Sequence, residues 1–475
     1  MSETISTDIC VIGAGSGGLT VAAGAVQMGA RVVLIEKGKM GGDCLNYGCV
    51  PSKALIAAAH AAEAARKGAA FGVLAEPDVC FRKVHDHIHG VIAEIAPADS
   101  VERFEGLGVR VIKAKARFTG PGEVEADGIR IRARRFVVAT GSMPARPPID
   151  GLDACPYLTN ETVFDLDARP DHLIVIGGGP IGCELAQAYR RLGAGVTVLE
   201  LRTIMPNDDP EAVDLVRRRL VAEGVDLREN VTIKAVRPEA GAAVVTTAGD
   251  DGAESRITGS HILVSAGRTA GVDGLGLEAA GIEYTAKGIK VDARMRTTNK
   301  KVFAIGDVAG SFQFTHMASY HGGIVIRNAV FNLPAKVKEN AVPWVTYTDP
   351  ELAHVGMSEA AACERYGNMV RILRWSFEEN DRAHTERETE GLIKAIIGPR
   401  GRILGATIVG ARAGEMIAMW VLAVSQGLKI GTIANMIVPY PTFSEVSKRA
   451  AGSYYTEALF GNRVRRLVRW LQRLP

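Results

Sequence analysis

The chain has 475 residues, of which 47% are hydrophobic and 23% are charged. These values are typical of a globular protein with a buried core, and the length predicts two to four domains. The formal net charge is +3, from 56 basic and 53 acidic residues, so the charge balance argues against a nucleic-acid partner. Glycine is frequent, at 53 residues, and much of it follows apolar runs, where backbone turns or approaches a ligand.

The seven cysteines are odd in number and scattered, at positions 10, 44, 49, 80, 155, 183 and 363. Such a set does not form the disulfide framework of a secreted domain, and it predicts a reducing compartment with one functional pair. A polar stretch follows Met1, and no apolar run reaches the ~18–20 residues of a membrane span. We therefore expect no signal peptide and a cytoplasmic protein.

The chain opens with an apolar strand at 8–12, a glycine-rich turn, an alanine-rich helix and a second apolar strand. The turn carries Gly13, Gly15 and Gly18, the spacing at which backbone can approach a pyrophosphate at a helix N-terminus. Glu36 closes the second strand, where a carboxylate would reach the ribose hydroxyls. This pattern predicts a dinucleotide-binding fold.

The next segment holds Cys44 and Cys49 in a glycine-rich loop that leads into a helix predicted over 52–66. Two thiols at this spacing can reach bonding distance and store two electrons as dithiol or disulfide. Pro51 is typical of a first helical position, so Cys49 is expected at a helix N-terminus, which lowers a thiol pKa, and Lys53 adds a positive charge. Zinc would need two further ligands with suitable spacing, and no such motif is evident, so we interpret the pair as redox-active.

Short strands with glycine turns are predicted over 101–135, and a linker over 144–148. The opening pattern then recurs about 160 residues after its first copy, which indicates two stacked dinucleotide-binding folds. Its residues are Gly177, Gly179, Gly182 and, at the close of the next strand, Glu200. A carboxylate at this place binds a free ribose 2′-hydroxyl and repels a 2′-phosphate, which favours NADH, with NADPH as the alternative. A third region of mixed strands and helices begins at Trp344.

Residues 41–55 resemble the active-site signature of the class I pyridine nucleotide–disulfide oxidoreductases, which include dihydrolipoamide dehydrogenase, glutathione reductase and mercuric reductase. The resemblance extends to both glycine fingerprints and to residues 139–141, 304–307 and 439–445, so it covers nearly the whole chain. It implies an FAD-dependent NAD(P)H oxidoreductase that passes electrons through a Cys44–Cys49 disulfide to a small-molecule acceptor. Candidate acceptors are a disulfide, a thiolate-bound metal ion such as Hg(II), or a quinone. Dihydrolipoamide dehydrogenase is one alternative, and a redox-sensing flavoprotein that regulates a partner is an alternative of another class.

By position, the resemblance implies a role for each site residue. FAD would bind at Gly13, Gly15, Gly18, Glu36, Lys53, Thr140, Gly141 and Asp307, and the nicotinamide nucleotide at Gly177, Gly179, Gly182, Glu200 and Gly267. Cys49 would be the flavin-proximal sulfur, and Cys44 the interchange sulfur that attacks substrate. Lys53 and Glu184 would form an ion pair beside the flavin N5, where a cation stabilises the reduced flavin. Tyr440 and Glu445 complete the implied catalytic set, and no metal ligands are predicted.

The implied architecture is α/β, with two Rossmann-like dinucleotide-binding domains and an α+β C-terminal dimerisation domain. We expect an FAD-binding domain at 1–152 and 287–340, an NAD(P)-binding domain at 153–286 and a dimerisation domain at 341–475. The resemblance also implies an obligate homodimer, in which the C-terminal domain of one subunit completes the active site of the other.

The C-terminal segment departs from the disulfide reductases, which carry a His–Pro followed by a Glu. Here Tyr440 replaces the His, while Pro441 and Glu445 remain. A phenol with a pKa near ~10 is a poor base at neutral pH, whereas an imidazole near ~6.5 is well matched, so we expect poor turnover of disulfides. Tyrosine here is similar to mercuric reductase, but the vicinal cysteine pair that ends that enzyme is missing, since no cysteine follows Cys363.

The last residues form a basic amphipathic pattern. The apolar positions at helical spacing are Val464, Leu467, Val468, Leu471 and Leu474, among arginines at 463, 465, 466, 469 and 473. Packing within the dimer or between domains, with the basic face in solvent, is the favoured interpretation. Peripheral contact with a membrane surface or an acidic partner is the alternative.

Overall fold

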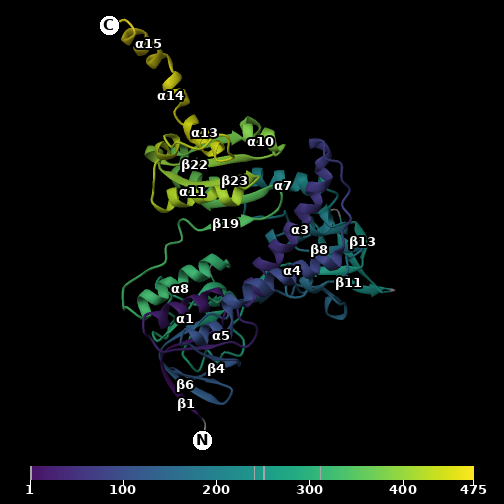
Figure 1. Cartoon of the computed structure of the whole chain (residues 1–475), viewed down its shortest axis with the longest axis vertical. Helices are drawn as coiled ribbons and strands as arrows, with labels where there is room; N and C mark the ends of the chain where they lie inside the picture. The colour runs from purple at the N-terminus through teal and green to yellow at the C-terminus, as the bar shows by residue number, and fades with distance from the viewer. Residues whose placement is uncertain (1–2, 240, 250–251, 311, 475) are drawn as a thin grey trace. The chain divides into compact units, whose positions relative to one another are not determined.

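The computed structural model describes residues 3–239, 241–249, 252–310 and 312–474. The chain forms two compact units, the first of Met1–Arg202 and Val225–Val337, the second of Thr203–Gly224 and Lys338–Pro475 (Figure 1). Both glycine fingerprints and the cysteine pair lie in the first unit. The boundaries expected between FAD-binding and NAD(P)-binding domains fall inside that unit and stay a prediction. Within the described residues, no helix is both long and apolar enough to cross a bilayer.

The N-terminal part of the first unit is built on a seven-stranded sheet of order β3-β2-β1-β6-β5-β4, with β18 also paired to β6. Strands β1, β2, β3, β6 and β18 are parallel, while β4 and β5 are antiparallel. The strands are β1 (Thr4–Ile12), β2 (Val32–Ile35), β3 (Arg110–Ile112), β4 (Ala116–Gly120), β5 (Glu123–Ala126), β6 (Ile129–Val138) and β18 (Val302–Ala304).

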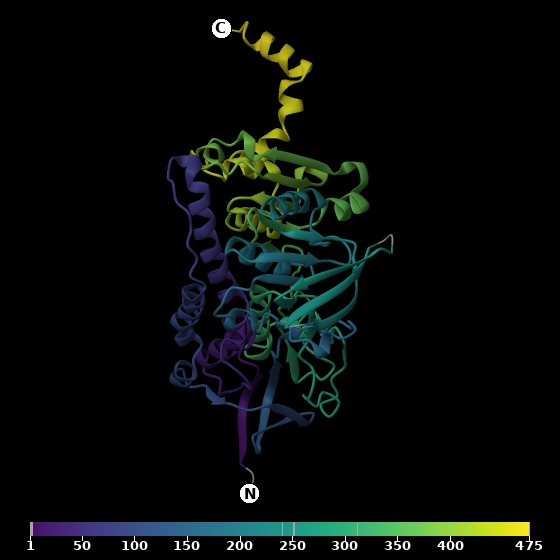
Figure 2. The same ribbon diagram turned by 90° about the vertical axis from the view of Figure 1, so that its right-hand side faces the viewer.

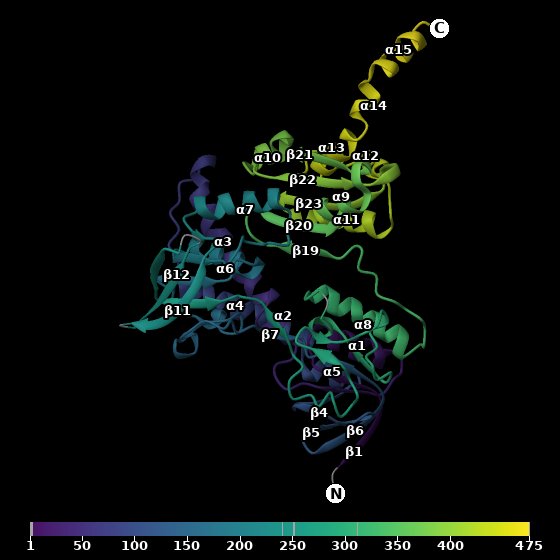
Figure 3. The same ribbon diagram turned by 180° about the vertical axis from the view of Figure 1, so that it is seen from behind.

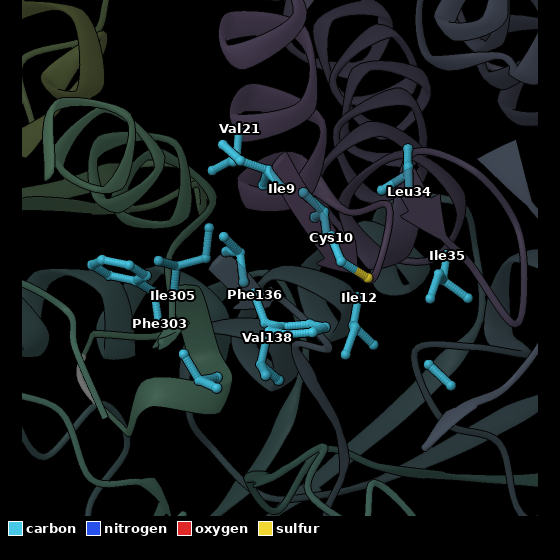
Figure 4. Packing of buried hydrophobic residues seen from close by; sticks show 14 of the residues in the cluster. Ile9, Cys10, Ile12, Val21, Leu34, Ile35, Phe136, Val138, Phe303 and Ile305 are labelled. Atoms are coloured by element: carbon cyan, nitrogen blue, oxygen red, sulfur yellow. The ribbon is translucent and has the colours of Figure 1, made fainter. Parts of the chain in front are cut away.

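The core of this sheet consists of continuous apolar runs, because parallel strands are covered on both faces. All of β2 and the last four residues of β1 are buried. Figure 4 shows Cys10 among Ile12, Phe136 and Val138, so this thiol is a core residue, and its burial raises its pKa. Helices α1 (Ser16–Gln27) and α8 (Thr315–Ala329) lie side by side on the sheet (Figures 1 and 3).

Four helices connect β2 to β3, and their bounds correct three predictions. They are α2 (Gly42–Asn46), α3 (Cys49–Lys67), α4 (Phe81–Ile95) and α5 (Val101–Gly106). The predicted loop around Cys44 contains the short helix α2, and α3 begins at Cys49, so that Pro51 is its third residue rather than its first. The strands expected from 101 begin only at β3, because the Ser100 hydroxyl accepts the N–H of Arg103 and caps α5.

The second glycine fingerprint lies in a four-stranded parallel sheet of order β10-β9-β8-β14. Its elements are β8 (His172–Ile176), α6 (Pro180–Arg191), β9 (Gly195–Leu199), β10 (Asp226–Arg228) and β14 (His261–Val264). An antiparallel sheet of β11 (Thr232–Glu239), β12 (Ala242–Ala248) and β13 (Glu254–Gly259) shares its apolar core. Two short ladders complete the unit, β7 (Ser142–Pro144) with β15 (Arg268–Ala270) and β16 (Tyr284–Thr285) with β17 (Gly288–Ile289).

The second unit is built on an antiparallel sheet of order β19-β20-β23-β22-β21. Its strands are β19 (Pro343–Thr346), β20 (Glu351–Gly356), β21 (Arg371–Ser376), β22 (Leu392–Ile397) and β23 (Ile403–Gly410). Its helices are α7 (Pro210–Ala222), α9 (Glu359–Tyr366), α10 (Asp381–Glu386), α11 (Ala413–Ser425), α12 (Ile430–Ala434), α13 (Glu445–Ser453), α14 (Thr456–Phe460) and α15 (Asn462–Leu471). The chain's four tryptophans, at 344, 375, 420 and 470, all lie in this unit. The α/β class predicted from sequence is confirmed.

Candidate active site

The two cysteines of the signature lie close together and differ in protonation. Cys44 lies in α2, Cys49 is the first residue of α3, and a hydrogen bond joins the two free thiols. This bond, aided by the Thr315 hydroxyl 3.4 Å from Cys49 Sγ and by the charge of Lys53, outweighs burial and lowers the pKa of Cys49 to about 6. The same bond, together with burial, raises the pKa of Cys44. The reduced pair is therefore a Cys49 thiolate beside a Cys44 thiol.

Two asparagines hold the redox segment in place. Asn46 Nδ2 donates to the carbonyl of Gly42 at 2.8 Å, which closes α2 on itself. Asn160 Nδ2 donates to Asp43 Oδ1 at 3.0 Å and to the carbonyl of Tyr47 at 3.1 Å. No sequence motif marks Asn160, which is 117 positions from Asp43 in the chain.

Lys53 lies one turn beyond Cys49 on α3 and forms the ion pair that the resemblance implied. Its Nζ is 2.7 Å from Oε2 of Glu184, which is 6% exposed on α6. A carboxylate this well buried needs a cation beside it. The pair therefore fixes the redox helix α3 against the helix of the second glycine fingerprint.

The first glycine fingerprint forms a turn that only glycine can adopt. Gly13 has a φ of +103°, and a Cβ there would lie 2.3 Å from the carbonyl oxygen of Ala139. A Cβ at Gly18 would lie 1.9 Å from the carbonyl oxygen of Gly13, whereas one at Gly15 meets nothing nearer than 3.9 Å. No side chain caps α1, so its first N–H groups face an open cradle suited to a pyrophosphate.

The second fingerprint repeats this geometry. Gly177 has a φ of +108°, and a Cβ there would lie 2.6 Å from the carbonyl oxygen of Ser265. A Cβ at Gly182 would lie 2.0 Å from the carbonyl oxygen of Gly177, and one at Gly179 meets nothing within 4 Å. Helix α6 has no side-chain cap either. The two turns thus offer equivalent sites for two dinucleotides.

The acidic residues that follow the two glycine fingerprints also have corresponding hydrogen bonds. Glu36 and Glu200 each accept a hydrogen bond from the backbone N–H of the second residue of their fingerprint. Each also accepts one from the backbone N–H of the residue two positions after the glutamate itself. The distances are 2.6 and 2.6 Å for Glu36, and 2.7 and 3.0 Å for Glu200. An ionised carboxylate accepts about four hydrogen bonds, so each retains capacity for ribose hydroxyls.

A polar network connects Asp307 to the residue before Cys44. Ser142 Oγ donates to Asp307 Oδ2 at 2.5 Å, and Arg268 Nε donates to Ser142 Oγ at 2.7 Å. The Arg268 guanidinium also lies 3.3 Å from Asp43 Oδ1. Burial raises the pKa of Asp307 against the opposing effects of Ser142 and Arg268. No sequence motif marks Ser142 or Arg268, because they are far apart in the chain and only the pairing of β7 with β15 brings them near each other, two register positions apart.

The remaining predicted nucleotide residues flank the same ladder. Thr140 Oγ1 donates to the carbonyl of Gly271 at 2.7 Å. Gly141 has a φ of +67° with nothing within 4 Å of a Cβ, and Gly267 has a φ of +104° with nothing nearer than 4.0 Å. These two glycines leave backbone accessible to a ligand.

Tyr440 and Glu445 lie in the second unit. The Tyr440 hydroxyl, on a side chain that is largely exposed, donates to Asp381 Oδ2 at 2.9 Å. This hydrogen bond, with the charges of Asp381 and Glu445, raises the pKa of Tyr440. Asn380 connects the segment that contains Asp381 to the segment that contains Tyr440, since its Nδ2 donates to the carbonyl of Thr442 at 3.0 Å. Tyr440 is therefore held as a protonated donor.

Residues 7–322 match the family described as pyridine nucleotide-disulphide oxidoreductase, and residues 342–451 match the dimerisation domain of that family. The chain is 33% identical over 461 residues to a mercuric reductase of Streptomyces lividans, covering 95% of this chain and 96% of the relative. It is 36% identical over 465 residues to a dihydrolipoyl dehydrogenase of Thermus scotoductus, covering 95% and 98%. The chain belongs to the pyridine nucleotide–disulphide oxidoreductase family.

Solved structures agree with this assignment. The copper(II) complex of the HOCl-induced flavoprotein disulfide reductase RclA from Escherichia coli aligns with a TM-score of 0.85 at 25% identity, over 94% of this chain and 99% of that one. LpdA from Mycobacterium tuberculosis aligns with a TM-score of 0.86 at 27% identity, with the same coverage. The predicted fold of two dinucleotide-binding domains and a dimerisation domain is confirmed.

Family membership confirms the predicted activity at the level of the class. The protein is an FAD-dependent oxidoreductase that uses NAD(P)H and a redox-active cysteine pair. The match to the dimerisation domain supports assembly as a homodimer.

Proposed function

We propose that this oxidoreductase passes electrons from NADH, through FAD and the Cys44–Cys49 pair, to a soft metal ion held by thiolates, such as Hg(II). The observation that carries the proposal is the state of Tyr440, which donates to Asp381 and has a raised pKa. A residue that keeps its proton at neutral pH cannot serve as the base that disulfide interchange requires.

FAD, when bound, supplies two-electron transfer between the nicotinamide and the cysteine pair. In our proposal its pyrophosphate lies at the open start of α1, with Gly13, Gly15 and Gly18 forming the turn and Glu36 binding ribose hydroxyls. Asp307, Thr140 and Gly141 border the same cofactor, and Lys53, fixed by Glu184, stabilises negative charge on its ring. The fit rests on the uncapped helix, the open glycine and the spare acceptors of Glu36.

The nicotinamide nucleotide, in the same proposal, binds at the start of α6. Gly177, Gly179 and Gly182 shape that turn, Glu200 accepts the ribose hydroxyls, and Gly267 leaves room beside them. The Glu200 carboxylate would repel a 2′-phosphate, which favours NADH over NADPH.

The protonation states of the cysteines favour a metal acceptor. Cys49 is the thiolate that we assign next to the flavin, and Cys44 is the interchange sulfur, which retains its proton. Attack on a disulfide requires a base to remove that proton, whereas a thiophilic metal ion displaces it on binding. Among the described residues no cluster of three or more His, Cys, Asp or Glu could hold a metal, so the thiol pair is the site we assign to the ion.

The cysteine pair supplies both electrons that reduction of the metal ion requires. Hg(II) gains two electrons, the Cys44 and Cys49 sulfurs lose two and form an S–S bond, and the single thiol proton, on Cys44, leaves when the ion binds. With FAD bound as the two-electron carrier, NADH would return two electrons to the disulfide, and one proton from solvent would restore the Cys44 thiol beside the Cys49 thiolate.

A disulfide such as lipoamide is the second candidate acceptor. It is favoured by the 36% identity to a dihydrolipoyl dehydrogenase and by the retention of Pro441 and Glu445. The two candidates differ in whether residue 440 must act as a base.

An acceptor screen with two variants tests the choice. NADH oxidation is measured with thiolate-bound Hg(II), lipoamide and glutathione disulfide, for the wild type, Tyr440→His and Tyr440→Phe. Because a positioned base contributes about 10²–10⁴-fold, Tyr440→His should raise kcat/KM for lipoamide by roughly 10²-fold. Tyr440→Phe should leave metal reduction within about twofold, since no proton passes through residue 440 in that reaction.

The opposite pattern would select the second candidate. Wild-type turnover of lipoamide faster than that of the metal complex, with loss of lipoamide activity in Tyr440→Phe, would show that the phenol takes part in disulfide interchange. Cys44→Ser and Cys49→Ser are the matched controls, and both should abolish reduction of either acceptor while NADH still bleaches the flavin.

A further inference from the structure

The C-terminal helix α15 presents two chemically distinct faces. At about 100° per residue, Val464, Leu467, Val468 and Leu471 fall within an arc of about 100°. The opposite side carries the arginines at 465, 466 and 469, and Trp470 lies at the boundary between the faces. This separation of an apolar stripe from a cationic face is the pattern of a helix that lies at an interface.

The described residues of the second unit leave the apolar face of α15 largely exposed. No residue of α14 or α15 is buried, and Leu467, Trp470 and Leu471 are 52%, 58% and 46% exposed. Phe460, at the end of α14, is 65% exposed. In Figures 1, 2 and 3 the two helices run outward from α13, away from the β19–β23 sheet. Clustered apolar side chains of this kind mark a binding surface.

We propose that α15 binds the surface of a membrane that contains anionic lipid, with its axis in the plane of the interface. Charge complementarity selects this partner, because five arginines lie between 463 and 473 and no acidic residue follows Glu457. Trp470 stands where the aromatic side chain of an interfacial helix lies, at headgroup level. The long arginine side chains can extend from the apolar stripe to the phosphates.

Dimerisation in this family is assigned to another part of the chain. The match to the dimerisation domain covers residues 342–451 and ends before α14 begins at Thr456. A homodimer carries two copies of α15, and the second copy binds at a high effective concentration once the first has bound. Two short helices together therefore give reversible, salt-sensitive attachment, which one helix of ten residues would give only weakly. Membrane binding by α15 does not depend on which electron acceptor the enzyme reduces.

Vesicle binding by the full-length holoenzyme tests this surface. The protein is sedimented with vesicles of phosphatidylcholine alone and of phosphatidylcholine mixed with phosphatidylglycerol. We expect binding to the mixed vesicles, with an apparent partition coefficient at least about tenfold higher than for phosphatidylcholine alone. Raising NaCl from about 0.05 M to about 0.5 M should weaken binding to the mixed vesicles by a similar factor, because salt screens the arginines.

Two variants act on the two faces separately. Leu467→Gln/Leu471→Gln and Arg465→Gln/Arg466→Gln/Arg469→Gln should each lower the partition coefficient at least about tenfold, with NADH turnover unchanged. The matched control is Val73→Gln/Leu74→Gln, which changes two exposed apolar residues of the first unit and should leave binding unchanged.

Three results would overturn the proposal. The first is wild-type protein that binds neither vesicle, and the second is tail variants that bind like the wild type. The third is conversion of dimer to monomer by Leu467→Gln/Leu471→Gln in light scattering, which would identify a second copy of the chain as the partner of this face. Flavin content and circular dichroism confirm folding of each variant, and the salt series on unmodified protein decides the question if a variant misfolds.

Discussion

Cys44 and Cys49 share one hydrogen bond, yet it drives their pKa values in opposite directions. The Cys49 thiolate accepts from the Cys44 thiol, and Thr315 and Lys53 add to its stabilisation. Helix α8 supplies Thr315 from 266 positions further along the chain, so the electron-receiving thiolate depends on tertiary structure as well as on its own motif.

The pH dependence of alkylation tests this arrangement. In protein reduced with NADH, iodoacetamide labelling of the Cys49 peptide, measured by mass spectrometry, should rise around a midpoint near 6. Cys44→Ala removes the main hydrogen bond and should move the midpoint upward, and Thr315→Val should move it upward by less. Labelling of the exposed Cys80 and Cys363 should be the same in all three proteins. A Cys49 midpoint that stays near 6 in Cys44→Ala would contradict the assignment.

The same pKa shift affects the stability of the reduced protein. The folded-state pKa of Cys49 lies below that of an unfolded thiol, so ionisation favours the folded state. This contribution is complete above the unfolded pKa of ~8.5 and is lost as the pH falls toward 6. Thermal unfolding of reduced wild type should therefore lose more stability than that of Cys49→Ser between pH 8.5 and pH 6.

At the scale of elements, two strand–turn–helix units share one geometry but serve different nucleotides in our proposal. Gly18→Ala places a Cβ 1.9 Å from a carbonyl of the first turn, and Gly182→Ala places one 2.0 Å from a carbonyl of the second. Gly18→Ala should lower FAD content, whereas Gly182→Ala should retain FAD and raise KM for NADH at least about tenfold, because each turn shapes its own pyrophosphate cradle. Flavin absorbance and steady-state kinetics separate the two effects.

Gly323→Ala is the matched control for these turns. Gly323 lies inside α8, and a Cβ there meets nothing within 4 Å. Alanine should stabilise the helix by about 0.5–1 kcal/mol without changing FAD content or KM. Loss of FAD from Gly182→Ala would show that the two turns are not independent.

Features that depend on local motifs could be predicted from the sequence. Contacts between side chains that are far apart in the chain could not. Both fingerprints and their acidic residues follow from motif and spacing, and the Lys53–Glu184 pair follows from the family resemblance. The Arg268–Ser142–Asp307 network and the Tyr440–Asp381 bond do not, because strands and helices far apart in the chain bring these side chains together. The start of α3 was also misplaced, since Pro51 is compatible with the third helical position as well as the first.

At the scale of the whole molecule, the segment 203–224 leaves the first unit and becomes part of the second. Lys394 of β22, which is 3% exposed, fixes it there, with Nζ 2.8 Å from Asp209 and Glu211 and 3.1 Å from Glu359. Burial lowers the pKa of Lys394, but its hydrogen bonds to these carboxylates outweigh burial and raise it. The stabilisation is therefore complete at neutral pH and is lost only as the pH rises through that raised value.

Lys394→Met should destabilise the second unit by about 3–5 kcal/mol, because it leaves the buried carboxylate of Asp209 without its cation. Tryptophan fluorescence during denaturation reports this loss, since every tryptophan lies in the second unit. Arg371→Met, which breaks an exposed pair with Glu457 in the same unit, should cost within about 1 kcal/mol. Equal effects of the two variants would show that the buried cluster contributes no more than a surface pair.

The placement of the tryptophans has an optical consequence. Indole emission overlaps flavin absorption, and in our proposal the flavin lies in the first unit while the indoles at 344, 375, 420 and 470 lie in the second. Resonance energy transfer from tryptophan to flavin therefore measures the separation of the two units in solution without any added label. Addition of NADH or of an acceptor to the enzyme would report, through the quenching of tryptophan, whether turnover changes that separation.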